Sequence, residues 1–249
     1  PKNLKQQFTK GILWSAIERF SAQGIQFILG IILARILLPK DYGLIGMLTI
    51  FLAVSITFVD SGFAAALVQK KDRDEKDYST VFYFNILVAL VFYLALFFTA
   101  PLIANFYNQP LLVSLTRVIG LTVVINSFAV VQRAKFTINI DFKTQTKASI
   151  FSTIISGTTG VYLAYKGYGV WSLVVQALTR AILNVLILWY YSKWLPLEGF
   201  NIDRFKRLFS FGSKLLVTGL INTVYNNIYL IIIGKVFSAD NLGFYTRAK

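Results

Sequence analysis

Residues 78–116, 39 in all, contain no charged side chain. A soluble domain rarely carries such a stretch, because about a quarter of its residues are usually charged. Asn105, Asn108, Gln109 and Pro110 separate an apolar run near residues 79–103 from a second one near 112–133, which continues past the uncharged stretch. Each run is long enough to cross about 30 Å of hydrocarbon as a helix. The stretch therefore predicts a membrane-spanning helical hairpin.

The composition agrees with a membrane protein. Hydrophobic residues make up 56% of the 249 residues and charged residues 14%. The apolar runs are continuous rather than alternating, which argues against the dyad pattern of a membrane β-barrel. The sequence has no cysteine and no histidine, so disulfide scaffolds, thiolate sites and histidine-based chemistry are excluded. We expect an all-α polytopic membrane protein with no metal site and no cofactor.

Seven segments are apolar and long enough to span a membrane as helices. We expect these helices near residues 11–38, 42–68, 79–103, 112–133, 148–165, 169–191 and 212–236. The first contains Glu18 and Arg19 and is too long for the apolar region of a signal peptide, so we interpret it as a true helix.

The distribution of lysine and arginine predicts the orientation of the helices. Three of these residues precede the first helix, four lie in 70–76, four in 133–147 and five in 193–214, whereas the loops on the other side hold six at most. Because cytoplasmic loops are enriched in Lys and Arg, we place the N-terminus in the cytoplasm. The net charge of +14 is then mostly loop charge that faces anionic lipid, and we expect no nucleic acid as partner.

A shift of the sequence by 200 residues aligns the first two predicted helices with the end of the chain. The aligned pairs are Ile28 with Ile228, Ile31 with Ile231, Ile32 with Ile232 and Gly43 with Gly243. Six crossings separate the copies, so both cross the membrane in one direction, as in a parallel repeat. We expect a six-helix N-terminal lobe at 1–198, a cytoplasmic amphipathic linker at 199–211, and the start of a second, truncated lobe at 212–249.

Polar side chains recur at helical spacing in three of the predicted helices. They are Arg19, Gln23 and Gln26 in the first, Gln176, Arg180 and Asn184 in the sixth, and Asn222 and Asn226 in the seventh. Such groups at bilayer depth face a partner or a cavity, and we interpret the stripes as walls of one hydrophilic cavity. The alternative is hydrogen bonding within a packed bundle, with Arg180 paired to Glu18 or Asp60. Glu18 and Asp60 are also the candidates for coupling to an ion or a proton.

Two short acidic motifs each allow two interpretations. Asp60, followed by Ser61 and Gly62, fits a cation or proton site and equally fits a capped kink beside the glycine. Asp72 and Asp74 form a DxD like that of some glycosyltransferases, but a run of mixed charges is typical of a solvated loop.

Residues 33–43 (LARILLPKDYG) and 60–69 (DSGFAAALVQ) carry a family resemblance. They resemble the opening of the polysaccharide transporters, the Wzx-type lipid-linked oligosaccharide flippases of the MATE-like MOP superfamily. The resemblance implies a two-lobe transporter of the bacterial inner (plasma) membrane rather than an enzyme. It implies that an undecaprenyl-pyrophosphate-linked glycan crosses to the outer leaflet by alternating access, with Arg19 and Arg180 receiving the pyrophosphate or acidic sugars. The implied partners are the lipid-linked glycan, the bilayer, and the glycan polymerase and glycosyltransferase machinery.

Two other functions remain as alternatives. A MATE-type cation-coupled exporter of organic cations shares the architecture but needs an acidic cavity, and the predicted spans hold more basic than acidic groups. A membrane enzyme of glycan assembly would use Asp72 and Asp74, but the predicted loops are too short to form a domain that holds a sugar nucleotide.

Overall fold

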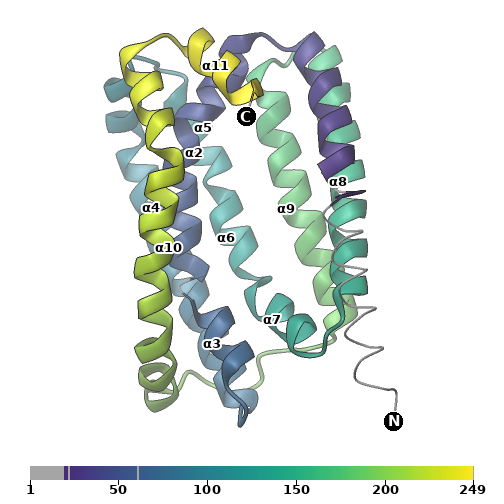
Figure 1. The fold of residues 1–249 in the computed structure, drawn as a ribbon, viewed down its shortest axis with the longest axis vertical. Helices are drawn as coiled ribbons and strands as arrows, with labels where there is room; N and C mark the ends of the chain where they lie inside the picture. Colours follow the sequence, from purple (N-terminus) through teal and green to yellow (C-terminus); the bar gives the residue numbers. More distant parts are fainter. Residues whose placement is uncertain (1–19, 22, 61, 249) are drawn as a thin grey trace.

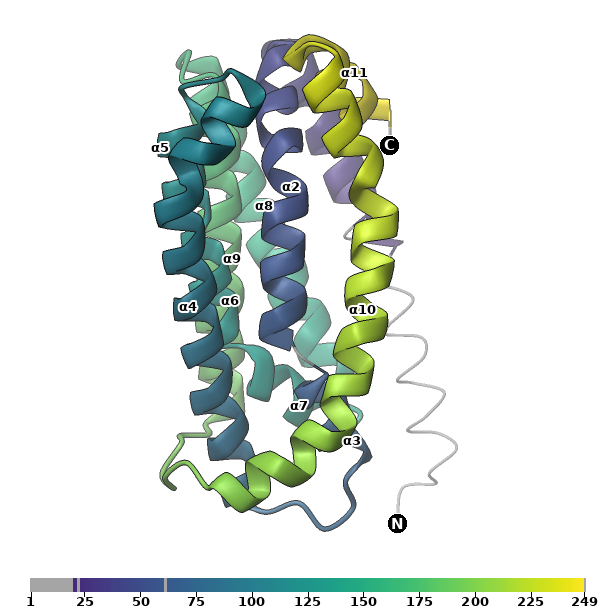
Figure 2. The same cartoon turned by 90° about the vertical axis from the view of Figure 1, so that its left-hand side faces the viewer.

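The computed structural model describes residues 20–21, 23–60 and 62–248, and every regular element in them is an α-helix (Figure 1). The helices are α2 (Pro39–Asp60), α3 (Phe63–Gln69), α4 (Glu75–Tyr107), α5 (Leu112–Ile119), α6 (Leu121–Ser127), α7 (Val130–Ile138), α8 (Phe142–Tyr165), α9 (Val170–Ser192), α10 (Ile202–Val236) and α11 (Ala239–Ala248). The long helices run side by side along the long axis of the bundle, with α3 near its lower end and α11 at its upper end (Figures 1 and 2). The all-α fold class expected from the sequence is confirmed at this level.

Within the described residues, five helical stretches are long and apolar enough to cross a membrane. They are Pro39–Gln69, Glu75–Tyr107, Leu112–Ile138, Val170–Ser192 and Ile202–Val236, and they coincide with five of the seven predicted spans. The first predicted span begins outside the described residues, and its described part contains the apolar helix Gln23–Ile36. The predicted span 148–165 lies within α8, whose 24 residues suffice in length but include many hydroxyl side chains.

Two predicted spans are interrupted. The second breaks after Asp60, where Gly62 has a φ of +68°, a conformation that favours glycine. The kink allowed by the sequence is therefore present. The predicted span 112–133 is present within the helical stretch Leu112–Ile138, but it is divided into α5, α6 and α7 at Gly120 and again before α7. Near these breaks hydroxyl groups bond to carbonyls of the preceding turn, such as Thr122 Oγ1 to the Ile119 oxygen at 2.6 Å, and so compete with the helical ladder.

α4 begins at Glu75, four residues before the predicted start, because a reciprocal cap precedes it. The Asp74 carboxylate accepts from the backbone N–H of Asp77 at 3.0 Å, and the Asp77 carboxylate accepts from the N–H of Asp74 at 3.0 Å. Such a capping box satisfies N–H groups that a helix start otherwise leaves without partners. The cap thereby fixes the connection between α3 and α4.

The predicted boundary at residue 211 is not a structural break. α10 is continuous for 35 residues and therefore joins the predicted linker 199–211 to the predicted span 212–236. It begins after Asn201, whose side-chain oxygen accepts from the N–H groups of Asp203 and Arg204 at 3.1 and 3.0 Å. Figure 2 shows its first turns crossing the lower end of the bundle before the helix rises beside α2. The non-helical connection lies earlier, at 193–201.

The start of α2 packs against α11 through reciprocal glycine contacts. A β-carbon at Gly43 would collide with the carbonyl of Ala239, and one at Gly243 would collide with the carbonyl of Pro39. A shift by 200 residues pairs Gly43 with Gly243 and Pro39 with Ala239, so it converts each contact into the other. Two copies related by a two-fold axis make this kind of exchanged contact. The repeat inferred from the sequence stays a prediction, with which these exchanged contacts are compatible.

Candidate functional site

A cavity of about 650 Å³ lies between α2, α5, α6 and α7 on one side and α8 and α9 on the other. In Figure 1, α2 and α6 stand across the middle of the bundle from α8 and α9. The volume of the cavity falls within the range of about 300–1,000 Å³ that is usual for ligand sites. The polar side chains in its lining are Tyr42, Thr122, Asn126, Arg133, Gln145, Ser149, Gln176, Arg180 and Asn184.

Small residues on α8 let α9 approach closely. Ser152, Ser156, Gly160 and Ala164 recur every four residues and are buried. A β-carbon at Gly160 would lie 3.0 Å from the side chain of Gln176 on α9. Such a seam of small residues is common where membrane helices pack tightly. The close approach positions α9 beside α8 along one wall of the cavity.

The predicted polar stripe of the sixth span lies on this wall. Gln176, Arg180 and Asn184 follow each other at four-residue spacing, and all three line the cavity. Residues four apart lie one above the other on the same helical face, so α9 carries a vertical row of amide, guanidinium and amide groups. The location agrees with the expectation, and the role of these groups is taken up below as a proposal.

The guanidinium of Arg180 contacts Gln26 of the helix Gln23–Ile36. With the amide of Gln26 turned so that its oxygen faces Arg180, this oxygen accepts from both terminal nitrogens of the guanidinium, from Nη2 at 2.8 Å. A neutral amide orients the guanidinium without cancelling its charge. Two residues that the sequence placed on separate stripes are thus brought together.

Arg133 supplies a second cation that the sequence analysis missed. Its Nη2 donates to Oδ1 of Asn184 at 3.0 Å, so Asn184 links α7 to the polar row of α9. Arg133 stands at the end of the predicted span 112–133 and was therefore counted among the loop cations. The spacing held a usable signal: Asn126 and Arg133 are seven residues apart, about two helical turns, and both line the cavity.

The cavity is electropositive. None of the described lining residues is acidic, whereas Arg133 and Arg180 each contribute a positive charge. Asp60 does not line the cavity and is exposed at the end of α2, although its charge interacts with that of Arg133. A recess lined by one sign of charge between low-dielectric walls concentrates ligands of the opposite sign. The site is therefore suited to an anionic group.

The other predicted site residues lie elsewhere. Glu18 and Arg19 fall outside the described residues, and Gln23 is exposed and does not line the cavity. Asn222 and Asn226 are exposed on α10, where the Asn226 amide donates to Asn222 Oδ1 at 2.9 Å.

The described lining of this cavity thus includes no residue of the α10 stripe, and its sharing of one cavity with α9 stays a prediction. The position of the stripe depends on which face of α10 meets α2. Thr223 and Thr57 share a hydrogen bond of 2.9 Å, and Gly219 also faces Thr57. Because successive side chains of a helix point about 100° apart, this contact leaves Asn222 beside the interface with α2 rather than in it.

The arrangement of helices matches a solved transporter structure. A structure titled as the inward-facing conformation of a multidrug resistance MATE family transporter of the MOP superfamily aligns with a TM-score of 0.61, over 93% of this chain and 56% of that chain. The sequences are 14% identical, so the likeness concerns the fold. Fold and hydropathy together define a multi-pass membrane protein of MATE-like architecture with a polar internal cavity.

Residues 32–249 match the family model described as polysaccharide biosynthesis protein, and the chain belongs to this family. Among its relatives, the teichuronic acid biosynthesis protein TuaB of Bacillus subtilis is 28% identical over 99% of this chain and 51% of TuaB. The succinoglycan biosynthesis transport protein ExoT of Rhizobium meliloti is 24% identical over 96% of this chain and 49% of ExoT. The lipopolysaccharide biosynthesis protein WzxC of Escherichia coli is 23% identical over 99% of this chain and 50% of WzxC. The chain therefore spans about half the length of these relatives.

Proposed function

We propose that this protein is a flippase that moves undecaprenyl-pyrophosphate-linked oligosaccharide or polysaccharide repeat units across the bacterial inner membrane. The observation that carries the proposal is the pair of guanidinium groups, Arg133 and Arg180, in a cavity whose described lining holds no acid. The family and the relatives named for polysaccharide biosynthesis support the choice of substrate class.

The chemistry of a lipid-linked diphosphate fits the two arginines. A diphosphate loses a large hydration energy when it enters the membrane, and charge-assisted hydrogen bonds from guanidinium groups offset this loss. The planar guanidinium can hold two phosphate oxygens at once, which a lysine cannot do. Gln26 and Asn184 orient Arg180 and Arg133 respectively, and neither adds a negative charge that would compete with the phosphates.

The remaining polar lining suits a glycan. Gln145, Ser149 and Gln176 present amide and hydroxyl groups from α8 and α9, which can both donate to and accept from sugar hydroxyls. The apolar lining residues come from α2, from α9 and, with Ile119, from α5. We propose that the glycan and diphosphate occupy the cavity while the prenyl chain stays in the surrounding lipid.

The transport cycle we propose is alternating access between two lobes with the N-terminus in the cytoplasm. The curated relatives are about twice as long as this chain, and we propose that a second lobe, related by the 200-residue repeat, completes the cavity. Arg19 is proposed as a further cation of the same site. Asp60 and Glu18 are proposed as coupling groups, Asp60 because its charge interacts with Arg133.

Substitution of single arginines in the full-length protein tests this proposal. Arg180→Gln and Arg133→Gln should each abolish surface glycan and leave undecaprenyl-linked repeat units on the cytoplasmic leaflet. Arg117→Gln is the matched control, because Arg117 lies on α5 outside the cavity and stacks on the Phe97 ring at 4.3 Å. Normal surface glycan in both cavity variants, at equal protein level, would refute the assignment.

The two alternative functions lack support at the site. A cavity for organic cations should contain carboxylates, whereas the described lining here is basic; efflux of cationic dyes on expression would reverse this conclusion. A sugar-nucleotide enzyme would need Asp72 and Asp74, yet Asp74 caps α4 and pairs with Arg204 at 2.8 Å. Nucleotide-sugar turnover by the purified protein, lost in Asp72→Asn, would favour the enzyme.

A further inference from the structure

Residues 193–201 form the non-helical connection between α9 and α10. It contains Pro196 and Gly199, and a connection of this composition would ordinarily act as a mobile tether. We propose instead that residues 193–211 form a fixed strap, which Trp194 and Arg204 clamp to the start of α4, so that the first turns of α10 move as one body with α4. This inference does not depend on the proposed function.

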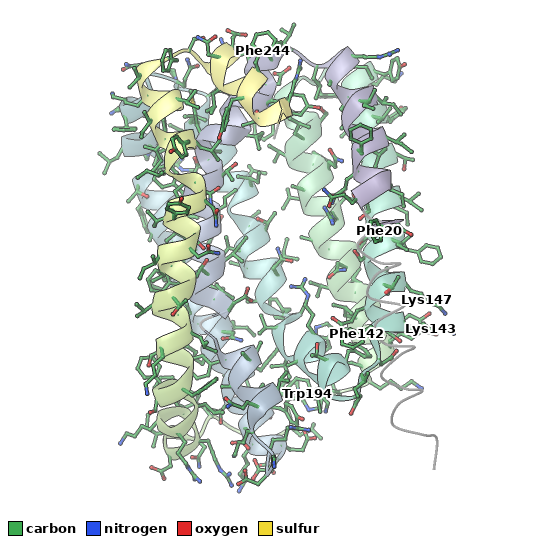
Figure 3. The ribbon with its side chains drawn as sticks, viewed as in Figure 1. Phe20, Phe142, Lys143, Lys147, Trp194 and Phe244 are labelled. Carbon is green, nitrogen blue, oxygen red and sulfur yellow. The ribbon has the colours of Figure 1, made fainter. Side chains whose placement is uncertain are left out.

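Trp194 fixes the first part of the strap. Its side chain is only 6% exposed, and its indole N–H donates to Glu75 Oε2 at 2.5 Å. The ammonium of Lys135 lies 5.2 Å from the Trp194 ring centre and 3.6 Å from the Glu75 carboxylate. The indole is thus held by a carboxylate at its edge and a cation at its face. Figure 3 shows Trp194 at the lower end of the bundle.

Backbone contacts fix the middle of the strap. The Tyr83 hydroxyl donates to the carbonyl of Pro196 at 3.3 Å, and the backbone N–H of Asn201 donates to Thr80 Oγ1 at 3.2 Å. Both partners belong to α4. A backbone group bonded to a rigid helix loses the freedom that a tether requires.

Arg204 fixes the first turn of α10. Its Nη2 lies 2.8 Å from Asp74 Oδ2, and its Nη1 lies 3.8 Å from Asp77 Oδ1. Asp77 is fully buried and pairs on its other oxygen with Lys70 at 2.5 Å. A buried carboxylate is costly unless opposite charges compensate it. Arg204 therefore has two acidic partners. One of them, Asp77, is buried, so water cannot take the place of Arg204 beside it.

Apolar packing extends the clamp to residue 208. The Phe205 ring lies 4.8 Å from the Phe84 ring and 5.8 Å from the Phe63 ring, and Leu208 is 4% exposed. At the next turn Gly212 crosses Gly62 so closely that a β-carbon on Gly62 would lie 2.6 Å from the Gly212 oxygen. The strap thus ends at a tight crossing where α2 itself is broken.

Beyond Gly212 a single face of α10 packs on α2. Thr223 and Thr57 share a hydrogen bond of 2.9 Å, and a β-carbon at Gly219 would lie 3.2 Å from Thr57. Val217, Ile221 and Tyr225 are exposed on the other side of the helix. The ion pairs and the buried indole that hold the strap to α4 are therefore confined to the part before Gly212.

Distances between pairs of spin labels test the strap. Because residues 1–249 contain no cysteine, exposed sites in them can be labelled singly after cysteine substitution of the full-length protein. The pair Lys71→Cys with Lys206→Cys spans the clamp. We expect a single narrow distance distribution for this pair. A broad or bimodal distribution in the protein without further substitution would overturn the proposal.

Removal of the clamp gives a second readout. Arg204→Gln should broaden the 71–206 distribution, whereas the matched control Arg207→Gln should not, because Arg207 is exposed and bonds only weakly, at 3.5 Å, to Asp203 of its own helix. If Arg204→Gln fails to fold, Asp74→Asn serves instead, since asparagine keeps the helix cap and removes only the charge. A narrow distribution that persists in the folded variant would refute the role of Arg204. These distances are measured without substrate or transport, so a failure here is distinct from a failure of the flippase assignment.

Discussion

Replacement of Gly62 by alanine should destabilise the protein through two separable costs. Gly62 has φ +68° and ψ 0°, and an L-residue in this left-handed conformation costs about 1–2 kcal/mol. The added β-carbon would also lie 2.6 Å from the Gly212 oxygen and 2.8 Å from Leu215 Cβ, and overpacking of this kind costs about 1–3 kcal/mol. The expected loss in the free energy of unfolding is therefore about 2–5 kcal/mol.

Two other glycines separate these costs. Gly167 has φ +83° and nothing within 4 Å of its β-carbon position, so Gly167→Ala should cost only the backbone strain, about 1–2 kcal/mol. Gly30 lies in the helix Gln23–Ile36 and also has nothing within 4 Å, so Gly30→Ala should stabilise by about 0.5–1 kcal/mol.

The assay is reversible unfolding of the full-length variants in mixed micelles by titration with SDS, followed by tryptophan fluorescence. The expected order of stability is Gly30→Ala, parent, Gly167→Ala, Gly62→Ala. A Gly62→Ala variant no less stable than Gly167→Ala would refute the close crossing of α10, and a Gly167→Ala variant as stable as the parent would refute the strain argument.

Three further predictions concern charge. Asp77→Ala should destabilise by about 1.5–3 kcal/mol in the same unfolding assay, because it removes the buried carboxylate that pairs with the partly buried Lys70 and Arg204. Asp72→Ala on the exposed turn should change stability by less than about 0.5 kcal/mol. Partial desolvation raises the pKa of Asp74, but the backbone N–H of Asp77 and the Arg204 guanidinium lower it by more. The pKa of Asp74 therefore lies below its ordinary value. Its contribution to stability should be present above pH 3.8 and should be lost as the pH falls through the folded-state pKa; Asp74→Asn should flatten this part of the stability–pH curve. Arg180→Gln should weaken binding of undecaprenyl pyrophosphate to the purified full-length protein about 10- to 150-fold, the equivalent of about 1.5–3 kcal/mol for a charge-assisted contact, and an unchanged affinity would remove Arg180 from the site.

Hydropathy and length determined which segments are helices. A backbone in hydrocarbon must satisfy its own hydrogen bonds, so a continuous apolar run of sufficient length has few structures available. Five predicted spans accordingly reappear as candidate spans in the described chain. The interruptions were harder to predict, because the split between α5, α6 and α7 depends on competition between hydroxyl side chains and the helical ladder.

Helical spacing also determined which polar residues share a face. It grouped Gln176, Arg180 and Asn184, and all three line one cavity. Only the tertiary structure supplied their partners: Gln26 meets Arg180, and Arg133 meets Asn184. The spacing of Asn126 and Arg133 indicated a shared face, but tertiary packing decided that Arg133 meets Asn184 of α9.

The stripes of α9 and α10 look alike in the sequence and differ in the structure. Asn222 and Asn226 have the same four-residue spacing as Arg180 and Asn184, yet they are exposed while α9 lines the cavity. Spacing along a helix fixes the angles between its side chains but not the direction in which their common face points. That direction was decided by packing between distant segments, here by the contact of Thr223 with Thr57.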